Sequence, residues 1–173
     1  MTDINKLMKI IGYNFRDKSL ITTALTHSSF SKENKFENNE RLEFLGDRVL
    51  GLIISSEIFK KNLSSTEGEL AKQQSFLVCK TTLKNVANNI KLGEFVNCTK
   101  SLKKNSLDSV IANTLEALIA AIYLDSNINQ TSKIVLKLWK SFLENINLSS
   151  FDPKSKLQEW SLKKKKSYLP MKL

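Results

Sequence analysis

Proline and glycine are scarce in this sequence of 173 residues, which contains two prolines and five glycines. Both prolines, Pro153 and Pro170, fall in the last 22 residues. An all-β chain needs frequent turns, and turns are rich in these two residue types. Their scarcity argues against the all-β class over the first 150 residues. We therefore expect an all-α fold, with one helical domain that has its own core and a short appendage after it.

Cysteine and histidine are almost absent. Cys79 and Cys98 are 19 positions apart and do not form a CxxC pattern. This spacing disfavours a zinc site and a disulfide framework, and we expect two reduced, packed thiols. His27 is the only histidine. A single histidine near the end of a predicted helix is more often structural than a general base, so we assign it a structural role.

Long apolar runs are missing as well. No stretch approaches the roughly 18 apolar residues of a membrane-spanning helix. The first ten residues, MTDINKLMKI, contain an acid and lack the apolar segment of a secretory signal. The sequence therefore predicts a cytoplasmic protein without a membrane partner.

Negative charge is outnumbered by positive charge. The 27 Lys and Arg residues against 17 Asp and Glu residues give a formal net charge of +10. Such an excess indicates a polyanionic partner, and nucleic acid is the common case. The excess is uneven, because residues 152–173 contain seven lysines and two acids and so carry +5.

The most informative stretch is NNERLEFLGDRVLG, residues 38–51. Glu40, Glu43 and Asp47 are spaced i, i+3 and i+7, which places them within an arc of about 60° on an α-helix. Asn39 is positioned to cap the helix, and the early acids suit the positive end of the helix dipole. The opposite side of the helix is expected to be apolar and to consist of Leu42, Leu45, Val49 and Leu52.

A capped, amphipathic surface helix explains most of this pattern, but not all of it. Phe44 lies beside the acids, and Gly46 and Gly51 stand where helix formers are expected. Each glycine in a helix costs about 1 kcal/mol relative to alanine. These exceptions favour a functional face over a solvated one.

A second polar pair lies in SLDSVIANTLEALIAAIYLD, residues 106–125. Asn113 and Glu116 lie about 60° apart on a helix, opposite an apolar face. That face consists of Ile111, Leu115, Leu118, Ile119 and Ile122. Small residues surround the pair and allow another helix to approach closely: Ala112, Ala117, Ala120 and Ala121. We expect the pair to be buried between helices, where a carboxylate needs a cation, a donor or a metal to stay ionised.

Periodicity predicts further helices before, between and after these two. Apolar spacing predicts a helix over residues 4–11, and Asp17 is placed to cap the next helix. Thr66 and Glu69 have the spacing of a capping box, which starts a helical pattern in two segments. The last expected helix spans residues 127–145.

These segments resemble a known family. ERLEFLGDRVL is similar to the signature helix of ribonuclease III, the endonuclease that cuts double-stranded RNA. Residues 106–125 resemble the second metal-binding segment of that family, and GYNFRDKSLITTALTHSSF resembles the opening of its nuclease domain. The resemblance implies the helical fold of the ribonuclease III nuclease domain over residues 1–148.

The resemblance also implies roles for six polar side chains. They are expected to serve as metal ligands (Glu43, Asn113, Glu116), as catalytic residues (Asp47, Glu116) and as supporting acids (Glu40, Glu67). One position departs from the family pattern, because the family most often has aspartate where this sequence has Asn113. Oxygen ligands without His or Cys suit Mg²⁺ better than zinc, and Mn²⁺ is expected to substitute.

The family acts as a homodimer on double-stranded RNA, so the resemblance implies the same partners here. Phe44, an aromatic residue on the acid side, is suited to insert into a second protomer. The implied reaction is Mg²⁺-dependent hydrolysis of double-stranded RNA to 5′-phosphate and 3′-hydroxyl ends with short 3′ overhangs. The implied process is the maturation of ribosomal, messenger and other RNA precursors.

Two other functions compete with the nuclease. The first is a relative of the nuclease domain that binds double-stranded RNA without cutting it, which Asn113 favours and the retained Glu43, Asp47 and Glu116 oppose. The second is a purely structural helical protein, which the acid faces on two helices disfavour. We favour the nuclease.

The C-terminal segment has a different character. DPKSKLQEWSLKKKKSYLP resembles the linker and first helix of a double-stranded-RNA-binding domain. Residues 149–173 are too few to build such a domain. They are expected to be a linker with the truncated start of that module, or a solvated basic tail.

Overall fold

The structure is a computed structural model that describes residues 4–30, 37–99 and 104–146, without the side chains of residues 104 and 105. The elements in these ranges are helical, as the sequence predicts, and one isolated parallel bridge joins Thr26 to Asn97. They are α1 (Ile4–Ile11), α2 (Lys18–Ala24), α4 (Glu40–Lys61), α5 (Glu67–Val78), α6 (Lys80–Asn89), the 3₁₀ helix η1 (Leu92–Glu94), α7 (Lys104–Asp125), α8 (Ile128–Leu138) and α9 (Lys140–Glu144).

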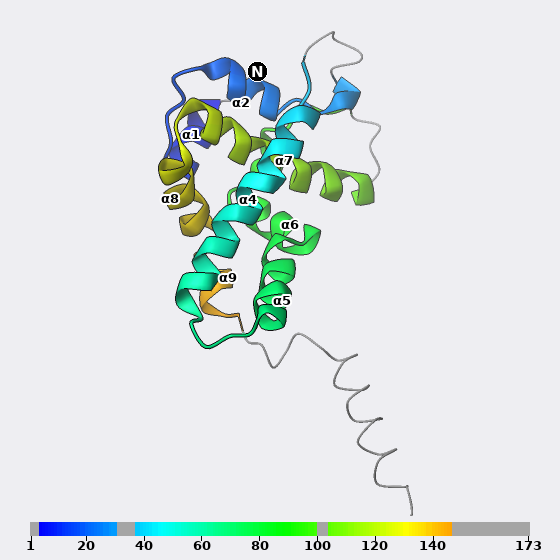
Figure 1. Ribbon diagram of the computed structural model, residues 1–173. Coiled ribbons are helices and arrows are strands. Elements are labelled where there is room, and N and C mark those ends of the chain that lie inside the picture. Colours follow the sequence, from blue (N-terminus) through cyan, green and yellow to red (C-terminus); the bar gives the residue numbers. More distant parts are fainter. Residues whose placement is uncertain (1–3, 31–36, 100–103, 147–173) are drawn as a thin grey trace, which may run out of the picture.

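Two helices of 22 residues, α4 and α7, cross in the middle of the molecule, and the other helices pack around them (Figure 1). The predicted apolar face of α7 is buried, and so are the four alanines beside its polar pair. Burial of a large aliphatic side chain contributes about 1.5–3 kcal/mol. The crossing of α4 and α7 is therefore the centre of the hydrophobic core.

The inward face of α4 differs from the prediction at one residue. Leu42 and Val49 are buried as expected, but the side chain of Leu52 is 59% exposed. Leu52 lies at the edge of the apolar arc, and Ile53 and Ile54 occupy the inward positions of that turn. The prediction for Leu52 was therefore wrong.

α7 is long and apolar enough to span a membrane when it is judged by length and composition alone. The segment Ser106–Asp125 has a mean hydropathy of 1.5, although it includes polar residues such as Asn113 and Glu116. In the fold, 61% of this segment is buried inside the protein. A core helix of a globular domain explains this hydropathy.

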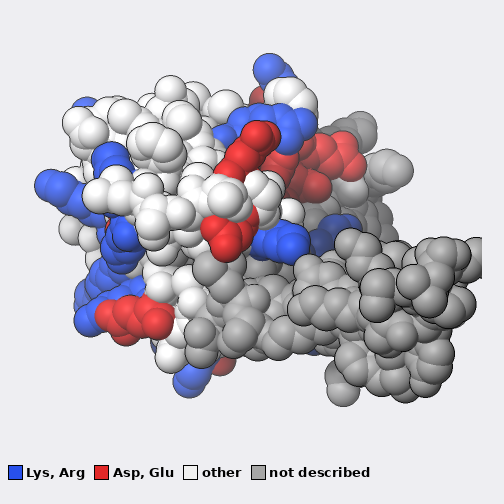
Figure 2. Space-filling view, turned by 60° about the horizontal axis from the view of Figure 1, so that its bottom comes forward, with Lys and Arg blue, Asp and Glu red and all other residues white. Residues whose placement is uncertain are grey.

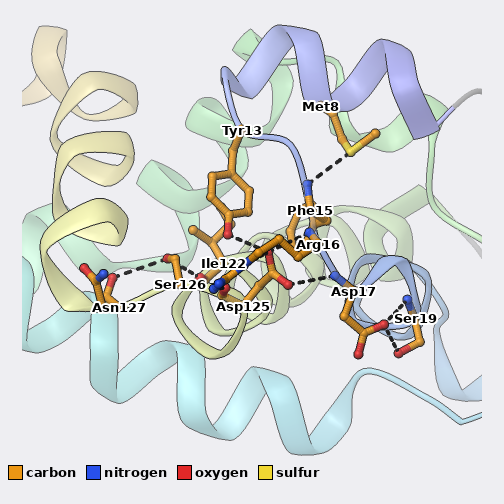
Figure 3. Close-up of polar contacts among 10 residues, drawn as sticks. All are labelled: Met8, Tyr13, Phe15, Arg16, Asp17, Ser19, Ile122, Asp125, Ser126 and Asn127. Carbon is orange, nitrogen blue, oxygen red and sulfur yellow. Dashed lines mark hydrogen bonds and ion pairs between the residues drawn. The ribbon is translucent and has the colours of Figure 1, made fainter.

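A buried carboxylate joins the end of α7 to the turn between α1 and α2 (Figure 3). Asp125 is 5% exposed, and its carboxylate accepts a hydrogen bond from the Tyr13 hydroxyl at 2.6 Å. The backbone N–H groups of Arg16 and Asp17 donate to the same carboxylate at 3.0 and 2.9 Å. Burial alone would raise the pKa of Asp125, but these donors together hold the pKa below its ordinary value. Asp17 also caps α2, as predicted, by accepting from the Ser19 N–H at 2.8 Å.

Two other local predictions are confirmed. α1 spans the predicted residues 4–11. At the start of α5, the Thr66 hydroxyl accepts from the Glu69 N–H at 3.4 Å, and the Glu69 carboxylate accepts from the Thr66 N–H at 2.8 Å. Cys79 and Cys98 are free thiols. The sequence therefore predicts helix starts well where the capping partners are close neighbours in the chain.

The single helix predicted over residues 127–145 is divided in two. Asn127 caps α8 by accepting from the Gln130 N–H at 3.0 Å, and α8 ends where Trp139 begins the turn into α9. Trp139 is fully buried, and its indole N–H donates to the carbonyl of Leu77 in α5 at 2.8 Å. The prediction of one helix was wrong because the indole docks on another helix at this point.

Candidate active site

α4 and α7 come into direct backbone contact at Gly46. A Cβ atom at this position would lie 1.8 Å from the backbone oxygen of Glu116 and 2.5 Å from its carbonyl carbon. No side chain fits into this space, so packing requires the glycine that the helix pattern does not explain. The contact also places Glu43 and Asp47, three positions before and one after Gly46, against the turn of α7 that bears Glu116.

Four polar side chains meet at this crossing, two from each helix. Glu43 and Asp47 come from α4, and Asn113 and Glu116 come from α7. The Asn113 carboxamide lies near enough to the Glu43 carboxylate to lower its pKa. Glu116 is half-buried, and the charges of Asp47 and Glu43 act on it. The structure therefore brings together the four residues that the sequence places on two polar faces.

Asp47 forms the exposed edge of this cluster. The Arg48 guanidinium lies 2.5 Å from the Asp47 carboxylate and 5.7 Å from the centroid of the Phe44 ring. Exposed ion pairs of this kind contribute little to stability, about 0–1 kcal/mol. The Asp47 side chain is 42% exposed, so a large substrate can reach this acid from solvent.

Glu116 forms the buried side of the cluster. Burial raises the pKa of its carboxyl, and the negative charges of Asp47 and Glu43 raise it further, to about 7. The positive charge of Lys80 acts in the opposite direction. A cation among these oxygens would favour the ionised form of Glu116, because opposite charges nearby stabilise a carboxylate.

The pKa of Glu43 is also raised, but less than that of Glu116. Burial raises the pKa of Glu43, while the hydrogen bond from Asn113 and the charge of Lys80 lower it. The charge of Glu40 raises this pKa, and that of His27 lowers it. The Nδ1 atom of His27 lies 2.9 Å from the Ser29 hydroxyl oxygen.

Lys80 is a residue of this site that the acid pattern does not reveal. It is the first residue of α6, and its ammonium group donates to the Ser109 hydroxyl of α7 at 3.3 Å. Lysine is disfavoured at the positive end of a helix dipole, and α6 has no acid in its first turn to offset the charge. This unfavourable placement is the sequence signal that could have identified it.

The start of α4 differs from the prediction. Asn39 does not cap the helix with its side chain, and the Asn38 side chain accepts the hydrogen bond from the Glu40 N–H at 3.0 Å. The amide of Asn39 instead turns into the core and donates to the Thr114 hydroxyl at 3.4 Å. The prediction of Asn39 as the capping side chain was therefore wrong, because its helical backbone angles direct it inward.

The two predicted supporting acids lie in different places. Glu40 is exposed and is close enough to Glu43 to raise its pKa. Glu67 is the first residue of α5 and lines a groove of about 540 Å³ with Phe59, near the other end of α4. Phe59 is 16 positions beyond Glu43, roughly 24 Å along the helix axis. Within a single protomer, Glu67 therefore does not reach the cluster of Glu43, Asp47, Asn113 and Glu116.

Phe44 lies beside an apolar groove. Its ring is 68% exposed, and Leu124 nearby in the same groove is 52% exposed. The groove has a volume of about 950 Å³, and its apolar lining includes Leu20, Leu42 and Leu45. An exposed aromatic side chain next to such a groove suits a two-fold contact, in which each protomer offers the same surface to the other.

The donor atoms at the crossing suit a hard cation. They are carboxylate oxygens and one amide oxygen, with no histidine or cysteine side chain among them. Within residues 4–30, 37–99 and 106–146, no three His, Cys, Asp or Glu side chains converge tightly enough to enclose an ion by themselves. Mg²⁺ keeps several water ligands and takes few from the protein, so an open set of oxygens fits it better than a closed zinc cage does.

The charged surface of the molecule is mixed in sign. On the face shown in Figure 2, acidic and basic side chains adjoin in some places and are separated by uncharged surface in others. The net charge of +10 is therefore not spread evenly over the surface. A polyanion at the acid cluster would need nearby cations to hold it there.

Sequence comparison identifies relatives over most of the chain. A family model described as Ribonuclease-III-like matches residues 17–142. Ribonuclease 3 of Rickettsia felis is 42% identical over 167 residues, which cover 93% of this chain and 74% of that protein. The sequence resemblance therefore extends far beyond the signature helix.

Structural comparison gives the same relatives. The nuclease domain of ribonuclease III from Campylobacter jejuni, solved at 2.2 Å, matches with a TM-score of 0.76 and 36% identity, over 85% of this chain and 100% of that one. A second structure of that domain, which concerns structural flexibility in the region involved in dimer formation, matches with a TM-score of 0.74 and 37% identity. It covers 80% of this chain and 97% of that one. The residues matched by the family model, 17–142, include both crossing helices.

Proposed function

Since this chain belongs to the ribonuclease III family, we propose that the polar cluster at the crossing of α4 and α7 is its active site. The chain has the all-helical fold of the ribonuclease III nuclease domain and is an endonuclease that cleaves double-stranded RNA. The observation that supports the site is the meeting of Glu43, Asp47, Asn113 and Glu116 around the contact between Gly46 and Glu116.

The family is typically metal-dependent, and we propose Mg²⁺ as the metal, with Mn²⁺ as a substitute. Glu43, Asn113 and Glu116 would hold it through oxygen atoms. A bound divalent ion neutralises charge on the phosphate and lowers the pKa of a bound water. Burial is the main cause that raises the pKa values of Glu43 and Glu116, and a cation beside these half-buried carboxylates would keep them ionised.

We propose that the acidic side chains of the cluster bind and orient the attacking water. Asp47 and Glu116 flank the reaction centre, where their carboxylate oxygens accept hydrogen bonds from the attacking water and hold it in line with the scissile bond. Glu40 acts as a supporting acid through its charge beside Glu43. Glu67 can support the cluster only from a second protomer, because its own chain holds it near the other end of α4.

The proposed assembly is a homodimer in which Phe44 of each protomer enters the apolar groove of the other. The exposure of Phe44 and the groove beside it support this arrangement. Double-stranded RNA would be recognised by its shape, its 2′-hydroxyls and its phosphates. The products would be 5′-phosphate and 3′-hydroxyl ends with short 3′ overhangs, from ribosomal and other precursors in the cytoplasm.

The proposed nuclease domain comprises residues 1–148. The segment 149–173 resembles the start of a double-stranded-RNA-binding module. It lies outside the residues that the structure describes. Its seven lysines are proposed to add affinity for RNA without sequence preference.

Cleavage of a labelled RNA duplex with Mg²⁺ and with a chelator tests the proposed site. Asp47→Ala is expected to abolish cleavage and to leave the helical content and the melting temperature close to those of the natural protein, because Asp47 lies at the exposed edge of the cluster. The matched control is Glu57→Ala on the same helix. Glu57 lies away from the crossing, and its carboxylate is 3.0 Å from the Lys61 ammonium group. An Asp47→Ala protein that cut the duplex at the natural rate would remove Asp47 from the mechanism.

A further inference from the structure

Lys80 is the cation of the crossing whose role the acid cluster does not explain. It comes from α6, which packs against α7, and it is exposed. Its ammonium group reaches the Ser109 hydroxyl at 3.3 Å. Ser109, Asn113 and Glu116 are spaced i, i+4 and i+7, so they lie along one face of α7. Lys80 is therefore held at the upstream end of the polar face that carries the site.

The next lysine of α6 gives a direct comparison. Lys84 lies one turn further along the helix, and its ammonium group is 2.5 Å from the Asp108 carboxylate. That carboxylate neutralises Lys84 locally. The partner of Lys80 is a neutral hydroxyl instead, so its full charge acts on its surroundings. The contact with Ser109 places Lys80 one turn of α7 before Asn113, and its charge lowers the pKa of both Glu43 and Glu116.

The position of Lys80 is unfavourable for the helix that carries it. The free N–H groups and the dipole at the start of a helix favour negative charge, and a cation there costs stability. α6 has no acid in its first turn. The same N-terminal end favours the binding of an anion, and the charge of Lys80 adds to that preference.

We propose that Lys80 binds a phosphate of the RNA strand that lies over the crossing of α4 and α7. A phosphate there would accept a hydrogen bond from the Lys80 ammonium group, and the acids of the cluster would hold the metal. The acids alone would repel the RNA backbone, and the positive charge of Lys80 would offset this repulsion. The inference rests on the proposed active site, because it takes the acid cluster as the place where RNA is cut.

The first measurement is RNA binding in the presence of a chelator, so that no cleavage accompanies it. A labelled duplex is titrated with the natural protein, Lys80→Met, Lys80→Arg and the matched control Lys84→Met at several KCl concentrations. Each lost phosphate contact reduces the slope of log affinity against log salt by about one. Lys80→Met is expected to reduce the slope by about one for each protomer whose Lys80 contacts the duplex. Lys80→Arg and Lys84→Met are expected to keep the slope of the natural protein.

The second measurement is steady-state cleavage at saturating Mg²⁺. Lys80→Met is expected to raise KM by roughly tenfold, as loss of one charged hydrogen bond does, and to change kcat less. An unchanged slope and an unchanged KM in Lys80→Met would overturn the proposal. It would also be overturned if the slope stayed natural and only the Mg²⁺ requirement fell, because Lys80 would then act solely as a counter-ion for the acids.

The two proposals fail in different ways. If Asp47→Ala cleaves normally, the proposed site is wrong, whatever Lys80 does. If Asp47→Ala is inactive and Lys80→Met binds and cleaves like the natural protein, the site is correct and the phosphate contact is wrong. Melting curves of the Lys80 variants check that each one folds.

Discussion

Residue 113 determines how much negative charge the site holds. The Asn113 carboxamide lowers the pKa of Glu43 as a hydrogen-bond donor, a role that an ionised aspartate at the same position could not have. Without metal, asparagine therefore reduces the repulsion among the carboxylates. In the proposed metal site, the amide oxygen of Asn113 can serve as a ligand, but it contributes no formal charge.

We expect Asn113→Asp to lower the Mg²⁺ concentration for half-maximal cleavage by about tenfold. The added charge attracts the dication, while desolvation and repulsion from neighbouring acids offset much of the gain and leave roughly 1–2 kcal/mol. Metal titration of the cleavage rate, with Mg²⁺ and with Mn²⁺, measures the shift.

Asn113→Ala is the control for the loss of the ligand oxygen, and it should need more Mg²⁺ than the natural protein. If the natural protein cut nothing with either metal while Asn113→Asp cut duplex RNA, the non-cleaving alternative would be correct for the natural chain.

The carboxyl of Glu116 predicts the pH dependence of the metal-free protein. Burial and the charges of Asp47 and Glu43 raise its pKa from 4.5 to about 7 in the folded state. The folded state then binds more protons than the unfolded state between these pH values, so stability falls as pH rises from about 4.5 to about 7. Melting temperatures with a chelator should show this loss, and Glu116→Gln should remove much of it. A natural protein and a Glu116→Gln variant with parallel pH profiles would contradict the assignment.

At the scale of the helices, two glycines of α4 have opposite roles. Gly46 lies against the backbone of Glu116, whereas the closest atom to a Cβ at Gly51 would be the side-chain amide nitrogen of Gln74, at 3.7 Å. An added methyl group at Gly46 must separate α4 from α7. A methyl group at Gly51 would make an ordinary van der Waals contact with Gln74, and alanine has a higher helix propensity than glycine.

Gly46→Ala is therefore expected to destabilise the fold by about 3 kcal/mol or more, because overpacking forces the backbones apart. Gly51→Ala is expected to be neutral or to stabilise by up to about 1 kcal/mol. Urea unfolding of both variants measures the difference. Equal stabilities of the two variants would contradict the close approach at Gly46.

The sequence predicts helices well where local contacts define them. The limits of α1, the Thr66–Glu69 capping box and the Asp17 cap all depend on residues within a few positions of one another. The break at Trp139 could not be predicted, because its partner is the carbonyl of Leu77, 62 positions away.

The candidate site follows the same rule. The shared faces of Glu43 with Asp47, and of Asn113 with Glu116, follow from helical spacing. The contact that joins the two faces depends on where α4 crosses α7, and the position of Lys80 depends on how α6 packs against Ser109. Neither long-range contact has a periodic signature in the sequence.

At the scale of the whole molecule, the exposed face of α4 is unusually apolar for a surface helix. The side chains of Phe44, Leu52 and Phe59 are each more than half exposed. They are distributed along the whole helix, from the groove at its start to the groove near its end. A second protomer on this face would cover them and would bring its own Glu67 into a new environment.

Phe44→Ala is expected to weaken the proposed homodimer by roughly 2 kcal/mol, as removal of a central aromatic side chain commonly does at an interface. Sedimentation velocity over a range of protein concentrations measures the change in the dimer dissociation constant. Leu63→Ala, which changes an exposed leucine in the turn after α4, is the control and should have little effect. An unaltered dimer in Phe44→Ala at low micromolar concentration would exclude the proposed contact.

The indole of Trp139 gives the protein an internal fluorescent reporter. It is removed from water and hydrogen-bonded to the carbonyl of Leu77, so its emission should lie at short wavelength in the folded state. Separation of α8 and α9 from α5 would expose the ring and move the emission to longer wavelength. Trp160 is the second of the two tryptophans in the sequence, so Trp160→Phe leaves a single emitter. That emitter would report the docking of the C-terminal helices independently of any measurement at the active site.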